Sequence, residues 1–235
     1  MGMIKAVFFD FDGTLVDYDS VLGRACEMAA LTLKNILRGK GIEVSYNILL
    51  DLVFSVERRY AKTTLVDRNE WWKIILRELN IPTTLSSEEL NRVTLAYWSE
   101  IMKAKPFSNV EYTLKYLKSK GYKLGIITNT DGLHSMKRTR IKRSGLMGYF
   151  DLVIVAGEDT EKQKPDPEPF LKAVKEFNLT PSECVMVGDT LSSDIEGAKR
   201  VGLITVYIRR GRLRTDSESI ADYVIDDIVE LTRLL

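Results

Sequence analysis

A short apolar run near the N-terminus, Ile4 to Phe9, constrains the fold of this chain most, because two aspartates and a glycine follow it at once. The run is short for a helix and suits a strand of a parallel sheet that helices cover on both faces. On an extended segment Asp10 and Asp12 point the same way, and Gly13 allows a sharp turn. Because two close carboxylates repel each other unless a cation or a shared proton intervenes, this stretch predicts a functional site.

The part of the chain after Pro106 alternates strand patterns with helix patterns. Strands are predicted at Lys123–Thr128, Leu152–Ala156, Cys184–Gly188, Ile204–Ile208 and Tyr223–Ile225. Among the helices between them, one has Asp166 as its N-cap and Pro167 at its first position. Such alternation predicts the α/β class, with a doubly wound parallel sheet of the Rossmann-like kind.

The segment between the first strand and this alternating part shows helical apolar spacing only. Amphipathic helices are predicted at Leu22–Leu37, Ile48–Tyr60, Asp67–Leu79 and Ser86–Ile101. Four such helices can bury their apolar stripes against one another as a small bundle. We therefore predict a catalytic core of residues 1–16 and 106–235 and a helical cap domain of residues 17–105. Because the insert begins just after Asp12, we expect it to cover the site.

Composition restricts the classes of binding partner and the cellular compartment that we expect for this chain. The 235 residues carry a formal net charge of +1, so no global field favours nucleic acid or an anionic membrane. The two cysteines have no metal-ligand spacing and indicate no disulfide framework, and no apolar run is long enough to span a membrane. We expect a cytoplasmic protein with no nucleic-acid or membrane partner, either a monomer or a homodimer.

Polar residues follow the predicted strands at their carboxyl ends, where ligands bind in open parallel sheets. These positions hold Asp10, Asp12, Thr128, Asn129, Asp189 and, a few residues further on, Asp194. Several carboxylates that meet there favour a hard cation, and oxygen ligands favour Mg²⁺. Lys164, in a loop between a strand and a helix, can balance their charge and bind an anion. A cation, a lysine, a hydroxyl and a carboxylate nucleophile together suit phosphoryl transfer.

These segments, taken together, resemble the four motifs of the haloacid dehalogenase superfamily of hydrolases. In chain order they are Asp10-Phe11-Asp12-Gly13-Thr14, Thr128-Asn129, Lys164-Pro165-Asp166-Pro167, and Gly188-Asp189 with Asp194. The helical insert between the first and second motifs is similar to that of the subfamily with a helical cap. The resemblance covers the whole chain and implies a Mg²⁺-dependent phosphatase that acts on a small phosphorylated metabolite.

The resemblance also implies roles for the residues that match the motifs. Asp10 would be the nucleophile that forms an aspartyl-phosphate, and Asp12 would act as the general acid and then as the general base. Thr128, with the backbone of Asn129, would bind phosphate oxygens. Lys164 would neutralise both the nucleophile and the phosphate.

The same resemblance implies the ligands of the metal ion. Mg²⁺ would be bound by the Asp10 side chain, the backbone carbonyl of Asp12 and Asp189. Asp194 would bind directly, bind through water, or orient Lys164. Taken alone, Asp194 is also compatible with a helix cap.

Three other functions remain open on the same fold. A phosphosugar mutase shares the core and retains the phosphate on its product. A 2-haloacid dehalogenase needs the nucleophile without the metal, and in that branch the second aspartate of the first motif is typically replaced, so Asp12 argues against it. A non-catalytic phosphometabolite-binding protein would have kept the fold without turnover, and the intact motif residues count against it.

Two further groups of residues have simpler interpretations. Trp71, Trp72 and Trp98 are predicted to lie in the core of the helical bundle, with one of the adjacent pair pointing away from its axis. Basic side chains gather in a helix predicted at Asp131–Ser144 and in a loop near residues 209–214. We interpret both as solvated faces, although the loop arginines are also candidates for binding an anionic substrate or a second subunit.

Overall fold

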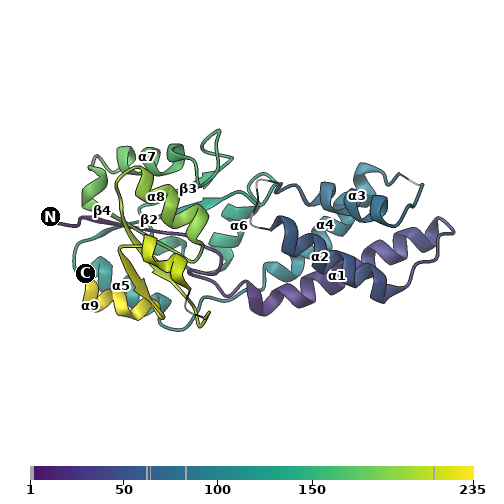
Figure 1. Cartoon of the computed structure of the whole chain (residues 1–235), viewed down its shortest axis with the longest axis horizontal. Coiled ribbons are helices and arrows are strands. Elements are labelled where there is room, and N and C mark those ends of the chain that lie inside the picture. The colour runs from purple at the N-terminus through teal and green to yellow at the C-terminus, as the bar shows by residue number, and fades with distance from the viewer. Residues whose placement is uncertain (1–2, 62, 64, 83, 214) are drawn as a thin grey trace. The chain divides into compact units, whose positions relative to one another are not determined.

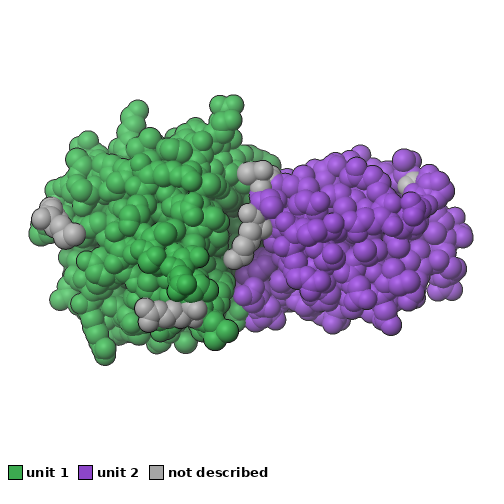
Figure 2. All heavy atoms as spheres, viewed as in Figure 1, with its two compact units in different colours: residues 1–17, 105–130, 134–235 green, residues 18–104, 131–133 purple. Residues whose placement is uncertain are grey.

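The structure, a computed structural model, describes residues 3–61, 63, 65–82, 84–213 and 215–235. These residues form two compact units, which Figure 2 distinguishes by colour. The sheet unit consists of residues up to 17, 105–130 and 134–235. The helical unit consists of residues 18–104 and 131–133.

Six parallel strands form the centre of the sheet unit (Figure 1). They are β1 (Ala6–Phe9), β2 (Lys123–Asn129), β3 (Leu152–Ala156), β4 (Cys184–Gly188), β5 (Ile204–Ile208) and β6 (Tyr223–Ile225), in the order β3-β2-β1-β4-β5-β6. The register places Phe9 of β1 between Ile126 of β2 and Val187 of β4. All four residues of β1 are fully buried, as expected for a central parallel strand. The predicted α/β class with a Rossmann-like parallel sheet is confirmed.

Helices lie on both faces of this sheet (Figure 1). They are α5 (Val110–Ser119), α6 (Met136–Arg143), α7 (Pro167–Glu176), α8 (Glu196–Arg200) and α9 (Leu231–Leu234). Short turns complete the unit: η1 (Met147–Tyr149), η2 (Pro181–Glu183), the π-helical η3 (Leu191–Ile195), η4 (Asp216–Ile220) and η5 (Ile228–Glu230). Between the sheet and α7, the rings of Phe8 and Phe177 stack with centroids 5.3 Å apart. Complete burial of a side chain such as Phe8 contributes about 1.5–3 kcal/mol.

Two glycines allow the strand-end segments to approach one another. Gly13 has φ +76°, and a Cβ there would lie 2.6 Å from Oδ2 of Asp189. A Cβ on Gly188 would lie 2.4 Å from Cβ of Asp194. Because any larger residue would push these segments apart, the glycines bring the aspartates within reach of one another.

The helical unit contains α1 (Asp19–Gly39), α2 (Tyr46–Tyr60), α3 (Arg68–Glu78) and α4 (Ser87–Ile101). Helix α4 begins with a capping box, since Ser86 Oγ accepts from Glu89 N at 3.2 Å and Glu89 Oε2 accepts from Ser86 N at 2.7 Å. Among the helices of the described residues, none is both long enough and apolar enough to cross a membrane.

The adjacent tryptophans of α3 are both fully buried, as predicted for residues of the bundle core, and neither of them faces solvent. Trp71 donates its indole N–H to the carbonyl of Leu65 at 2.9 Å, and the Arg68 guanidinium lies 3.8 Å from its ring centroid. Trp72 donates to Thr94 Oγ1 at 2.7 Å. The segment before α3 covers one ring and α4 covers the other, which simple helical periodicity does not capture.

The basic helix begins later than predicted. Gly132 has φ +82° and Ser135 has φ +63°, and such left-handed residues interrupt a helix. As a result α6 runs only over Met136–Arg143. The preceding residues 131–133 belong to the helical unit, where a Cβ on Gly132 would meet the carbonyl oxygen of Val66 at 2.4 Å.

Candidate active site

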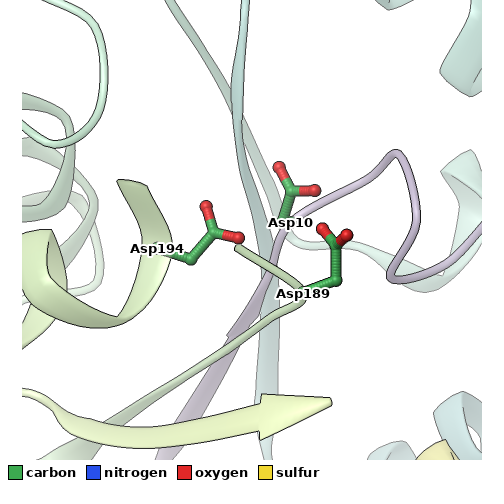
Figure 3. A group of neighbouring side chains, drawn as sticks. All are labelled: Asp10, Asp189 and Asp194. Atoms are coloured by element: carbon green, nitrogen blue, oxygen red, sulfur yellow. The ribbon is translucent and has the colours of Figure 1, made fainter. Parts of the chain in front are cut away.

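Three buried aspartates meet at the carboxyl edge of the sheet (Figure 3). Asp10 follows β1, Asp189 follows β4, and Asp194 lies in the π-helical turn η3. One carboxylate oxygen from each lies within 4.8 Å of the other two. The backbone N–H of Asp10 donates to the carbonyl of Val187 at 2.9 Å, so the sheet ladder itself fixes where its side chain starts.

Lys164 joins two of these aspartates. Its Nζ donates to Asp10 Oδ1 at 2.7 Å, to Asp194 Oδ1 at 2.8 Å and to the carbonyl of Ile127 at 2.8 Å. All three ammonium protons are therefore used. The Asn129 side chain holds the lysine backbone, because its Oδ1 accepts from Lys164 N at 2.8 Å and its Nδ2 donates to Lys164 O at 3.2 Å. The amide thereby fixes the loop that carries the lysine.

Burial sets the electrostatics of this cluster. It raises the pKa of Asp10 to about 6, because Lys164 only partly offsets the cost of burying the charge and Asp194 adds repulsion. Burial also disfavours the charged form of Lys164, but the carboxylates of Asp10 and Asp194 outweigh it and raise the pKa of the lysine. The ammonium therefore stays charged, and the crowded carboxylates favour a further positive charge.

The donor set suits a hard divalent cation. The three closely spaced ligand atoms are all carboxylate oxygens, and such ligands favour Mg²⁺ or a similar ion over softer metals. Asp189 also accepts from Arg212, through Oδ2 at 2.7 Å and through its carbonyl at 2.8 Å. Both oxygens of Asp194 accept hydrogen bonds, since Oδ2 takes the Thr190 N–H at 3.0 Å and Oδ1 takes Lys164.

The Asp12 side chain lies apart from this cluster and contacts helix α6. Its Oδ2 accepts from Arg140 Nη1 at 3.0 Å and from Lys137 Nζ, and its Oδ1 accepts from Arg140 Nη2. Burial would raise the pKa of Asp12, but Arg140 and Lys137 outweigh it and hold the pKa well below the usual range. The carboxylate is therefore ionised and held by both cations.

The interpretation of the basic helix as a solvated face is wrong for these two residues. The side chains of Lys137 and Arg140 are only 6% and 3% exposed. On the same helix, Arg138 contacts Asp159 at 2.6 Å, while Lys142 is exposed. The missed signal is the spacing of three residues, which places Lys137 and Arg140 on one helix face.

Two of the loop arginines contact residues of the predicted motifs. Arg210 donates to the carbonyl of Thr14, and Arg212 holds Asp189 as described, so these two are structural partners of the site. Arg209 instead contacts Asp226 at 2.9 Å, and Arg214 lies outside the described residues. Thr128 is buried on β2, the strand next to β1.

Comparison with known proteins identifies the family of this arrangement. A sequence model of the haloacid dehalogenase-like hydrolases matches residues 4–202. A glyceraldehyde 3-phosphate phosphatase of Pyrococcus furiosus is 33% identical, over 100% of this chain and 94% of the relative. A phosphoglycolate phosphatase of Aquifex aeolicus is 29% identical, over 99% of this chain and 97% of the relative. The crystal structure of a phosphatase of the same family from Thermococcus onnurineus has a TM-score of 0.71 and 30% identity, over 98% of this chain and 97% of that one.

Proposed function

Because this chain belongs to the haloacid dehalogenase-like hydrolase family, we propose that it is a Mg²⁺-dependent phosphomonoester hydrolase that acts on a small phosphorylated metabolite. The observation that carries the proposal is the Lys164 ammonium, which joins Asp10 to Asp194 beside the third carboxylate, Asp189. Phosphoryl transfer depends on such charge balance around a positioned nucleophile. Relatives of this chain with phosphatase names support the same reaction class.

In the first half of the reaction, Asp10 is the nucleophile. Lys164 binds its Oδ1, which leaves Oδ2 to attack phosphorus while the bond to the leaving oxygen breaks. Asp12, which takes up a proton from solvent once it has left the α6 cations, gives that proton to the leaving oxygen, so the products are an aspartyl-phosphate and a free hydroxyl compound. The hydroxyl of Thr128 and the backbone N–H of Asn129 bind phosphate oxygens in this proposal.

In the second half, water attacks the phosphorus of the aspartyl-phosphate and Asp12 accepts its proton. Free Asp10 and inorganic phosphate result. Because both oxygens of Asp12 accept from α6 cations in the structure, the side chain must release at least one of these contacts to reach the reacting oxygens. We therefore interpret these contacts of Asp12 as its resting arrangement.

The side chains of Asp10 and Asp189, with the backbone carbonyl of Asp12, would hold Mg²⁺. The ion, when bound, supplies positive charge that offsets the developing charge on the phosphoryl oxygens. We assign Asp194 to the positioning of Lys164, since its Oδ1 already binds that lysine and its Oδ2 binds the backbone of its own turn.

The direct test is phosphate release from a panel of phosphomonoesters, measured with Mg²⁺ and again with excess chelator. The first compounds to include are glyceraldehyde 3-phosphate and 2-phosphoglycolate, because relatives are named for activity on them. We expect metal-dependent release. No release from any compound by the folded protein with Mg²⁺ present would contradict the proposal.

Three further readouts separate the other functions on this fold. A mutase would convert sugar phosphates to isomers that keep their phosphate. A dehalogenase would release halide from a 2-haloacid in the presence of chelator. A binding protein would bind phosphometabolites without turnover, so ligand-induced stabilisation with no phosphate release would favour it.

A further inference from the structure

Helix α6 places two buried cations on the carboxylate of Asp12. Lys137 and Arg140 lie three residues apart, and their charged ends converge on the two oxygens of this one side chain. Both side chains are almost fully buried, whereas the Asp12 side chain is 23% exposed. The carboxylate is therefore the most exposed of the three charged groups.

The proposed reaction requires this carboxylate to move. A general acid must present a proton to the leaving oxygen, and an oxygen that accepts from two cations does not carry one. When Asp12 turns toward the bridging oxygen, the position that its carboxylate occupies between Lys137 and Arg140 becomes open to another group. Because Asp12 serves the leaving oxygen in the proposed reaction, we expect the leaving part of the substrate to be the part that can reach this position.

We propose that Lys137 and Arg140 form a carboxylate subsite, which binds an acid group on the leaving part of the substrate while Asp12 acts on the bridging oxygen. The inference rests on the proposed function and names its substrate class, the phosphate esters of short hydroxy acids. A carboxylate fits because the subsite already holds one, and because the arginine offers two parallel N–H donors.

The exchange also keeps charge balanced. Each cation contacts a carboxylate before the reaction through Asp12 and during the reaction through the substrate. A neutral leaving group would instead leave the two cations without this replacement while Asp12 is displaced. Because removing one partner of a buried charge pair is costly, the neutral substrate is disfavoured.

Two compounds that differ only at the group in question test the subsite. In 2-phosphoglycolate the leaving part ends in a carboxylate, and in glycolaldehyde phosphate it ends in an aldehyde. The measurement is kcat/KM for each compound with Mg²⁺, in the wild type and in the variants Lys137→Met, Arg140→Gln and Lys142→Met. The last variant removes an exposed charge from the same helix and serves as the matched control.

We expect the wild type to prefer 2-phosphoglycolate by at least about tenfold, the effect of one charged hydrogen bond. Lys137→Met and Arg140→Gln should each lower this ratio about tenfold, Lys142→Met should leave it unchanged, and Arg140→Lys should restore part of it. Dividing the kcat/KM ratio of the two compounds in the wild type by the same ratio in a variant cancels the difference in intrinsic reactivity between the compounds. If α6 only supported Asp12 structurally, both compounds would lose activity equally and the ratio would stay constant, which overturns the subsite.

Binding separates failure of the subsite from failure of the proposed function. Calorimetric titration of the Asp10→Asn protein with each compound needs no turnover and no variant of α6. Tighter binding of 2-phosphoglycolate supports the subsite even where neither compound is hydrolysed, whereas equal affinities overturn it. Phosphate release at equal rates from both compounds would overturn the subsite and leave the phosphatase assignment standing.

Discussion

Two aspartates that stand two residues apart end in opposite electrostatic surroundings. Asp10 shares one ammonium, Lys164, with Asp194, and burial raises its pKa to about 6. Asp12 accepts from two cations of helix α6, and they hold its pKa below the usual range. The same sequence motif therefore contributes one aspartate to each of two clusters that differ in charge balance.

This difference indicates which sign of charge each cluster would bind. In the Asp10 cluster, three carboxylates crowd one another, so a divalent cation relieves repulsion there. In the Asp12 cluster, two buried cations contact the carboxylate of Asp12, and in our proposal an anion of the substrate takes its place. A metal ion and an acidic phosphate ester would satisfy both sides at once.

Replacing Asp10 should have the largest effect. Asp10→Asn keeps the volume of the side chain but removes the attacking oxygen, so kcat/KM for the best phosphate ester should fall at least about 10⁴-fold. The matched variant Asp12→Asn should retain the ability to form the aspartyl-phosphate from a substrate with a good leaving group, because the nucleophile is intact. A burst of p-nitrophenol from p-nitrophenyl phosphate measures this difference. Residual turnover of Asp10→Asn above about 1% would contradict the nucleophile assignment.

Replacing Lys164 should break the first cluster and spare the second. Lys164→Met leaves Asp10 and Asp194 buried without their ammonium, which should lower the free energy of unfolding by about 3–5 kcal/mol. Phosphate release should fall by about 10²–10³-fold, as for other charged groups that face a transition state. Urea denaturation and steady-state kinetics measure the two effects.

The stability loss of Lys164→Met should be compared with that of Arg140→Gln, a variant of the second cluster. Asp12 keeps Lys137 in that variant and is partly exposed, so the loss of stability should be smaller than for Lys164→Met. Equal losses in the two variants would show that the clusters do not differ in the way proposed. Both proteins should first be shown to be folded by circular dichroism.

The first cluster follows from the sequence more directly than the second. An apolar run that ends in aspartates predicts a strand and a strand-end site from local pattern alone, and the structure places Asp10, Asp189 and Asp194 together. The partners of Asp12 come from a helix more than a hundred residues later in the chain. A run of basic residues in such a helix is usually solvated, so composition favoured the wrong interpretation of Lys137.

The limits of local sequence patterns also explain where the observed fold differs from the predicted one. Helical periodicity finds the apolar stripe of α3 but assigns only one face to the core, whereas the segment at Leu65 and helix α4 bury both tryptophans. The late start of α6 depends on Ser135, a residue type that enters the left-handed region only under tertiary constraint. The roles of the site residues stay predictions until the variants are measured.

Metal binding should distinguish Asp189, which would bind the ion through its side chain, from Asp12, which would bind it through its backbone carbonyl. At a free Mg²⁺ concentration 100 times the dissociation constant, the ion should stabilise the wild type by about 2.7 kcal/mol. Asp189→Asn removes a proposed ligand and should reduce this stabilisation at the same concentration. Asp12→Asn should retain it, because the proposed ligand there is the backbone carbonyl and the side chain faces α6. Thermal denaturation with and without Mg²⁺ measures the shift, and equal loss in both variants would contradict the ligand assignment.

A surface ion pair, with the Lys5 side chain 49% exposed and the Glu183 side chain 19% exposed, gives the reference for both buried clusters and the smallest expected effect. Lys5 Nζ contacts Glu183 Oε1 at 2.6 Å, and this bond, with the N–H and hydroxyl of Thr180, lowers the pKa of Glu183 from 4.5 to about 2. A lowered carboxyl pKa stabilises the folded protein above about pH 4.5, and this contribution is lost as pH falls toward 2. Glu183→Gln should therefore lower Tm at pH 6 by less than Lys164→Met or Arg140→Gln lowers it.

The difference in Tm between the wild type and Glu183→Gln should shrink as pH falls through that window. Melting curves at intervals from pH 6 downward, for as long as both proteins stay folded, measure the trend. Glu176→Gln removes the same charge from a pair whose atoms lie 3.7 Å apart and controls for net charge. A Tm difference that stays constant or grows toward low pH would contradict the pairing of Glu183 with Lys5. It would also remove the surface reference against which the burial of Asp10 and Asp12 is judged.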